Sequence, residues 1–246
     1  MNKFVDRLNN IFTRANVCKS HGIDHAIAVM AHADLAIKSK NYKISNRSKD
    51  AVKLAALLHD ADDRKFFPLH KNYENLKNVL YDKPNTFVDL VVRMVSLVSS
   101  ASNADRIPED VIGKEWMLIP RYADRIEALG IIGVERCFQY NKTKQRPMYI
   151  DSTPRAKTEK EIFNIATEER YNSYVGNSNS MIDHYYDKLL RISNVPINND
   201  YLVQHAKERQ QITIRFILYF GHLEIMTEKD VDKFIENEKL NQLVYK

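Results

Sequence analysis

The most constraining feature of the chain is an apolar run that ends abruptly in charge, at residues 51–65. Residues 54–58 read Leu-Ala-Ala-Leu-Leu, and Ala51 lies about one helical turn earlier. This pattern is typical of a helix buried on several sides. Residues 59–65 then read His-Asp-Ala-Asp-Asp-Arg-Lys. An ionised carboxylate away from water is costly unless it is paired or binds a metal ion, so we expect chemistry at the end of this helix.

Few helix-breaking residues interrupt the chain. Its 246 residues contain only 6 Gly and 7 Pro, and apolar residues recur at intervals of three and four. We therefore predict an all-α fold, a single helical bundle over residues 1–246 with a core at about 20–222. The two cysteines, Cys18 and Cys137, form no Cys-x-x-Cys pair, which argues against a zinc ribbon or a disulfide scaffold.

No membrane association is expected, because no run approaches the roughly 20 apolar residues of a membrane span. The amino terminus also lacks the apolar core of a signal peptide. With the cysteine usage, this predicts a soluble cytoplasmic protein. The oligomeric state stays open, with a dimer as one option.

The apolar spacing predicts a series of helices joined by polar turns. We expect helices at about 2–17, 20–40, 46–65, two between 70 and 101, one at 116–130, and others at 158–171, 181–190 and 203–218, then a short one after Thr227, which would act as its cap. Residues 137–157 lack periodicity and contain Pro147 and Pro154, which indicates a long irregular loop. Gly130 and Gly133 are interpreted as packing contacts, because no strand precedes them as in a dinucleotide-binding motif.

The formal net charge is only +5, but it is unevenly distributed. Between Arg136 and Lys160 there are seven cations and two carboxylates. Such a segment attracts phosphate-rich ligands in general, although a solvated basic loop is an equally good interpretation. The small overall charge does not require nucleic acid as a partner.

Four side chains on three expected helices combine the chemistry of a metal site: His25, His59, Asp60 and Asp124. Two imidazoles and two carboxylates suit a divalent ion that keeps open positions for water and substrate. Here the chain resembles the HD-domain metal-dependent phosphohydrolases, whose pattern is a His, a later His-Asp pair and a distal Asp within Ala-Asp-Arg. The resemblance implies that these four residues ligate one ion, with Mn²⁺ favoured and Mg²⁺, Co²⁺ or Fe²⁺ as alternatives.

The resemblance is most specific to small bacterial HD-domain nucleotide pyrophosphohydrolases and covers about residues 20–222. It is carried by the segments 21–25 (His-Gly-Ile-Asp-His), 57–66, 123–133, 146–149, 184–190 and 206–209. Three positions depart from the pattern: Gly22 and Tyr122 each replace a frequent Asp, and no basic residue occurs at 100–103.

The resemblance implies hydrolysis of nucleoside or deoxynucleoside triphosphates to monophosphate and pyrophosphate. Asp63, one turn after His59 if the helix continues, would orient or deprotonate the attacking water. Lys65 would assist at the phosphates. Further candidates for substrate contacts are Arg125, Arg146, His184 and Lys188. Arg125 is also a candidate brace for its helix, and His184 a candidate helix cap.

Other functions stay open on the sequence. Binuclear HD enzymes need extra histidines, and only His70 lies between His59 and Asp124, so one metal ion is expected. Nucleotide phosphatases and alarmone hydrolases also use a mononuclear site, but alarmone hydrolases carry Glu-Asp where this chain has Asp63 and Arg64. A different class is a metal-containing protein that has lost catalysis and binds nucleotide or nucleic acid through its basic segment.

Overall fold

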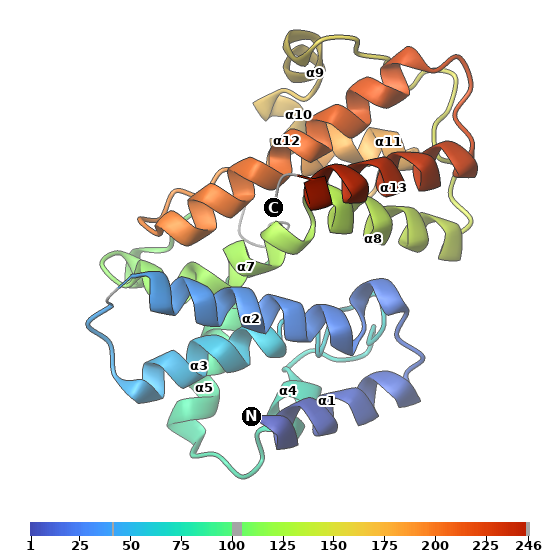
Figure 1. The fold of residues 1–246 in the computed structure, drawn as a ribbon. Coiled ribbons are helices and arrows are strands. Elements are labelled where there is room, and N and C mark those ends of the chain that lie inside the picture. The colour runs from blue at the N-terminus through green and yellow to red at the C-terminus, as the bar shows by residue number, and fades with distance from the viewer. Residues whose placement is uncertain (41, 100–104, 245–246) are drawn as a thin grey trace. The chain divides into compact units, whose positions relative to one another are not determined.

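The computed structural model describes residues 1–40, 42–99 and 105–244, and within these ranges every regular element is a helix (Figure 1). The predicted all-α fold is therefore confirmed. Contacts divide the chain into two compact units, one of residues 1–124 with 196–202 and one of residues 125–195 with 203–246. Residues 100–103, where the sequence lacks an expected basic residue, lie outside the described ranges.

The first unit contains the amino-terminal helices. They are α1 (Asn2–Arg14), the 3₁₀ turn η1 (Lys19–His21), α2 (Ile23–Ser39), α3 (Asn46–Leu57), α4 (Glu74–Val79), α5 (Asn85–Ser96), the 3₁₀ turns η2 (Glu109–Val111) and η3 (Glu115–Leu118), and α7 (Ile119–Glu127) as far as Asp124. Helix α3 packs against α2 and α5, and α1 packs against α2 and α4. The centre of this unit is therefore α3.

Burial explains why α3 forms and where it begins. Ser45 caps the helix, because its Oγ accepts a hydrogen bond from the Ser48 N–H at 3.1 Å. The side chains of residues 54–58 are at most 2% exposed, as the apolar run predicts. The helix ends at Leu57, however, and residues 58–62 form turns. The expected continuation to residue 65 is wrong.

The second unit contains the carboxyl-terminal helices. They are α8 (Gly130–Thr143), α9 (Glu159–Ile165), α10 (Glu168–Asn172), α11 (Met181–His184), the π-helical turn η4 (Tyr185–Leu189), α12 (Asp200–His222), which enters this unit after Leu202, and α13 (Glu228–Val244). Helix α13 packs against α8, and the η4 turn contacts α10. In this core the ring of Phe216 packs against the rings of Tyr185 and Phe234.

Several predicted boundaries in the second unit need correction. Residues 137–143 belong to α8, so the irregular segment begins only after Thr143. The helix expected at 158–171 is two helices, α9 and α10, each with its own threonine cap. Helix α13 is 17 residues long rather than short. Thr227 does precede α13, and the N–H and the hydroxyl of Thr227 both donate hydrogen bonds to the Asp230 carboxylate.

The two glycines near the start of α8 have separate structural reasons. Gly130 has φ +70°, a left-handed conformation that favours glycine, and it is the first residue of α8. A Cβ on Gly133 would lie 2.3 Å from the carbonyl oxygen of Ala128. The packing interpretation is therefore confirmed for Gly133. None of the described helices is both long enough and apolar enough to cross a membrane.

Candidate metal centre

The centre is built around the turn that follows α3. Leu58 closes the helix with its N–H donating to Leu54 O at 2.9 Å, and His59 and Asp60 come next. The His59 side chain is 2% exposed and that of Asp60 is 17% exposed. The buried helix thus delivers an imidazole and a carboxylate into the interior of the first unit.

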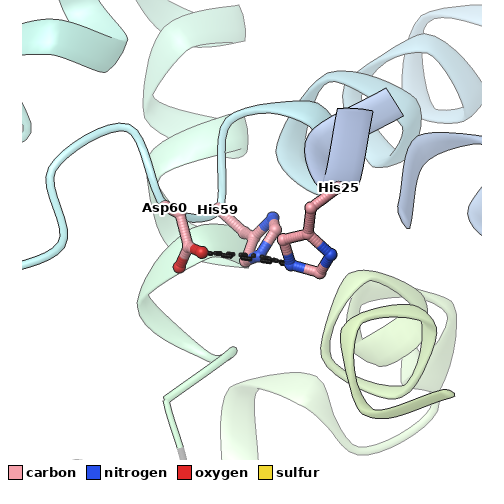
Figure 2. A group of neighbouring side chains, drawn as sticks. All are labelled: His25, His59 and Asp60. Carbon is pink, nitrogen blue, oxygen red and sulfur yellow. Dashed lines mark hydrogen bonds and ion pairs between the residues drawn. The ribbon is translucent and has the colours of Figure 1, made fainter. Parts of the chain in front are cut away.

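Helix α2 supplies a second imidazole opposite the first. The Nε2 atoms of His25 and His59 are 3.2 Å apart, and both side chains are almost fully buried. Asp60 Oδ2 lies 3.3 Å from His59 Nε2 and 4.0 Å from His25 Nε2. Figure 2 shows the three side chains turned toward one another. Two ring nitrogens and a carboxylate oxygen therefore face the same point.

Asp124 on α7 brings a second carboxylate to the pair of imidazoles. Its Oδ1 lies 3.3 Å from His25 Nε2 and 3.4 Å from His59 Nε2. One turn earlier, the guanidinium of Arg121 is buried and donates from Nε to the carbonyl oxygen of Leu97 at 2.6 Å. This bond holds α7 in place beside the end of α5. All four predicted metal ligands of the first unit are thus brought together.

The electrostatics of the cluster favour a positive charge at its centre. Burial alone would lower the pKa of His59, but the nearby carboxylates of Asp60 and Asp124 outweigh it and raise that pKa well above the usual value. Burial would raise the pKa of each carboxyl group, but the nearby imidazoles outweigh it and lower both pKa values: chiefly His59, with His21 also acting on Asp60 and His25 on Asp124. The site therefore retains a proton when no other cation occupies it.

The donor set fits a divalent metal ion. His59 Nδ1 is 2.8 Å from the carbonyl oxygen of Ala56, so the Nδ1–H donates there and leaves the Nε2 lone pair for a ligand. Ligand atoms of His25, His59 and Asp60 all lie within 4.8 Å of one another. Nitrogen and carboxylate donors with open positions suit the ions of hydrolytic sites rather than a closed structural zinc. The cluster is compatible with a divalent metal ion.

Asp63 and Lys65, the predicted catalytic residues, lie in the turns after the His-Asp pair and not on a continued helix. Asp63 Oδ1 accepts a hydrogen bond from the Lys65 N–H at 2.8 Å, and Asp63 Oδ2 is 3.6 Å from Lys65 Nζ. The Asp63 carbonyl oxygen also accepts from the N–H groups of Phe66 and Phe67. Asp63 therefore organises the turn, and its side chain is 21% exposed.

The four predicted substrate contacts belong to the second unit. Arg125 is buried on α7, whereas Arg146 donates from Nη2 to Asn177 Oδ1 at 3.0 Å. His184 Nδ1 lies 3.2 Å from the Tyr174 hydroxyl. Lys188 lies in the π-helical turn.

His184 is the last residue of α11 and does not cap its amino end. Ser180 does so, because its Oγ accepts from the Asp183 N–H at 3.1 Å. The substrate role of His184 stays a prediction.

Some features of the centre were beyond the sequence. The tautomer of His59 is set by the backbone carbonyl of Ala56. A backbone group is the same for every residue type, so the sequence cannot indicate this contact. His21 is indicated by the sequence only as the first residue of the segment 21–25; it lies in η1 rather than on α2, and its ring centroid is 6.4 Å from that of His25. Its Nδ1 is 3.0 Å from Ser20 Oγ. Tyr122, at a position where the resemblance expects an Asp, is fully buried.

Comparison with known proteins gives one clear sequence relative. Over 222 residues the chain is 40% identical to the uncharacterized protein L803 of Acanthamoeba polyphaga mimivirus, which covers 81% of this chain and 88% of L803. No model of a protein family matches the chain.

Solved structures share the fold at lower identity. A protein from Lactobacillus plantarum has a TM-score of 0.64 at 19% identity, covering 89% of this chain and 93% of that one. An HD-superfamily hydrolase from Bacillus thuringiensis has a TM-score of 0.57 at 20% identity, with coverages of 89% and 93%. Bacillus subtilis YpgQ, solved in complex with ADP, has a TM-score of 0.53 at 20% identity, with coverages of 85% and 93%. The chain therefore shares its fold with these solved proteins, one of which is an HD-superfamily hydrolase.

Proposed function

Because this chain belongs to the family of mimivirus protein L803 and has the HD-superfamily fold, we propose that it is a metal-dependent phosphohydrolase acting on nucleoside or deoxynucleoside triphosphates. The reaction would release the monophosphate and pyrophosphate. One observation carries the proposal: two imidazole nitrogens 3.2 Å apart, with carboxylate oxygens of Asp60 and Asp124 beside them.

The four side chains of the cluster would hold a single ion, for which we favour Mn²⁺. When bound, such an ion polarises a phosphoryl oxygen and makes hydroxide available near neutral pH. His25 and His59 would contribute Nε2, and the hydrogen bond from His59 Nδ1 to Ala56 O keeps that ring in the required orientation. Because the two histidine side chains are almost fully buried, the protein limits the water that can compete for them.

Asp63 is our candidate for orienting the attacking water and accepting its proton. It follows the His-Asp pair by three residues, and its Oδ1 is fixed by the Lys65 N–H. The second oxygen has Lys65 Nζ at 3.6 Å, so the lysine keeps a positive charge near the carboxylate. Lys65 is about half exposed and would neutralise a phosphate.

A nucleotide substrate is supported by two considerations. YpgQ, a protein of the same fold, has been solved in complex with ADP. The predicted substrate contacts of this chain, Arg125, Arg146, His184 and Lys188, are cationic or hydrogen-bonding groups of the kind that bind phosphate oxygens. These four side chains therefore remain our candidates for binding the phosphates of the triphosphate.

The test is a panel of nucleoside and deoxynucleoside triphosphates incubated with the purified chain and Mn²⁺. Ion-exchange chromatography separates pyrophosphate from orthophosphate, and we expect monophosphate and pyrophosphate in equal amounts. Asp60→Ala should abolish turnover, whereas Asp89→Ala, an exposed carboxylate on α5, should not. Full activity of the Asp60→Ala protein would overturn the assignment of the centre, and orthophosphate as the only inorganic product would favour a phosphatase.

A binding protein without catalysis is the competing function. Several cations of the basic segment already have internal partners: Arg136 Nη1 donates to Glu127 O at 2.9 Å, and Lys142 Nζ pairs with Glu228 at 2.6 Å. Arg155 donates to the carbonyl oxygens of Phe220 and Leu223. These contacts weaken the case for a nucleic-acid surface. Salt-sensitive binding of an oligonucleotide without turnover would support this alternative instead.

A further inference from the structure

A second group of metal-ligating side chains lies just beyond the first, in the segment between α3 and α4. Asp62, His70 and Glu74 each offer one ligand atom, and these atoms all lie within 4.8 Å of one another. His70 Nδ1 is 2.7 Å from Asp62 Oδ1 and 3.8 Å from Glu74 Oε2. None of the three residues belongs to the predicted ligand set of the first centre.

The group is held in place by contacts that leave its ligand atoms together. Asp62 Oδ1 and Oδ2 accept hydrogen bonds from the N–H groups of Asn75 and Leu76, at 2.9 and 3.0 Å. The Asn75 side chain in turn donates to the Ala61 carbonyl oxygen at 2.7 Å. The Asp62 side chain is only 7% exposed. One carboxylate of the group is thus fixed in position before any ion arrives.

The other two ligands both come from the end of the segment nearest α4, four residues apart. The His70 ring stacks on Phe67, with ring centroids 5.2 Å apart and an angle of 25° between the planes. Glu74 is the first residue of α4, and its two oxygens accept long hydrogen bonds of 3.4 Å from the N–H groups of Lys71 and Asn72. These contacts hold the Glu74 carboxylate on the side of the His70 ring, with Oε2 at 3.8 Å from Nδ1.

The separations bracket what a small tetrahedral ion requires. Bonds of about 2.0–2.1 Å to nitrogen and oxygen place neighbouring ligand atoms roughly 3.3–3.4 Å apart in a tetrahedron. The distance from His70 Nδ1 to Asp62 is shorter than this value and the distance to Glu74 is longer. A hydrogen bond between His70 and Asp62 explains the shorter distance, but it does not explain why Glu74 lies 3.8 Å from His70. Replacing the Nδ1 proton by an ion would even out the two distances.

We propose that Asp62, His70 and Glu74 form a second divalent-metal site, which takes Zn²⁺ and is independent of the first centre. One imidazole and two carboxylates are common zinc ligands, and the partial exposure of His70 and Glu74 leaves a fourth position for water. The site would tie the start of the segment at Asp62 to its end at Glu74. The residues between them include Asp63 and Lys65.

The experiment uses Zn²⁺ itself with the full chain, stripped of metal by a chelator and then desalted. We expect the wild-type protein to bind one more equivalent of zinc than His70→Gln, in which the new amide can still donate to Asp62. Glu74→Gln should also lose this equivalent. Asp60→Asn, which damages only the first centre, should retain it, and so should His32→Gln, a matched change at a histidine that contacts Tyr201 instead.

Hydrogen exchange gives a second readout that does not require activity. Zinc should slow amide exchange across residues 62–76 in the wild-type and Asp60→Asn proteins, and it should have no such effect in His70→Gln. Equal zinc content in the wild-type and His70→Gln proteins would overturn the proposal. Equal exchange across this segment with and without zinc would do so as well. Because neither measurement uses a nucleotide, both outcomes are separate from the test of the proposed phosphohydrolase.

Discussion

Binding of the metal ion at the first centre should release a proton, and its affinity should therefore depend on pH. The carboxylates of Asp60 and Asp124 raise the pKa of His59 well above its usual value, while their own pKa values are lowered. Near neutral pH the metal-free centre thus carries one proton, in a space where two Nε2 atoms are 3.2 Å apart. A divalent ion bound there would take the place of that proton.

The size of the effect follows from the exchange of one proton for one ion. Below the raised pKa of His59, each unit of pH should change the free energy of Mn²⁺ binding by about 1.4 kcal/mol, or roughly tenfold in Kd. Affinity increases as pH rises and levels off above that pKa. The same proton stabilises the metal-free fold, so the folded state without metal should lose this contribution as pH rises through the pKa of His59.

Titration calorimetry measures the Kd for Mn²⁺ and the number of protons released on binding. The His70→Gln background is used because it removes the proposed second site. The observed enthalpy at pH 7 in two buffers of different ionisation enthalpy gives the number of protons released, and we expect about one per ion. In Asp60→Asn, the loss of one carboxylate lowers the pKa of His59, so fewer protons should be released and binding should be weaker. A Kd that is constant from pH 6 to 8, with no proton released in either buffer, would refute the reasoning.

Three further predictions concern stability and reactivity. Gly133→Ala should lower the Tm by roughly 4–8 °C, because its Cβ would meet the Ala128 carbonyl oxygen at 2.3 Å and this overpacking exceeds the helix-propensity gain of about 1 kcal/mol. In the control Gly22→Ala, the new Cβ meets nothing nearer than 3.5 Å, so the Tm should be nearly unchanged. Equal decreases in Tm for the two variants would contradict the packing argument. Leu57→Ala, at a fully buried position, should cost about 2–5 kcal/mol in urea unfolding, and a loss below about 1 kcal/mol would mean that α3 is not the packed centre of its unit. Burial raises the pKa of Cys137 to about 12, so iodoacetamide at pH 8 should modify this thiol in the unfolded chain but not in the folded one, as peptide mass spectrometry would show.

The fold class could be predicted because it rests on local patterns, and so could one half of the His/Asp cluster. Apolar spacing identified α3 and its burial, and the His-Asp pair at its end stood out because charge after a buried run needs a partner. His25 and Asp124 lie on other helices, and only the resemblance to HD-domain proteins joined them to the pair. The structure places the four side chains beside one another.

The misplaced elements share a physical reason, which is that local periodicity cannot register tertiary contacts. Residues 137–143 look irregular, but they continue α8 because this helix packs against α13. The pairing of Asp62 with the N–H groups of Asn75 and Leu76 spans 13 and 14 residues, so no short-range pattern could indicate it. The same holds for the approach of His70 to Asp62.

The early end of α3 is what brings the side chains of His59 and Asp60 together. In a continued α-helix, adjacent residues point about 100° apart, so the two side chains would diverge from the backbone. In the turn after Leu57, the His59 ring bends back until its Nδ1 bonds to Ala56 O, and Asp60 Oδ2 comes within 3.3 Å of His59 Nε2. The sequence pattern of a helix running to residue 65 would have separated these ligands. The departure from helical geometry, directly after a helix that burial holds rigid, therefore creates the centre.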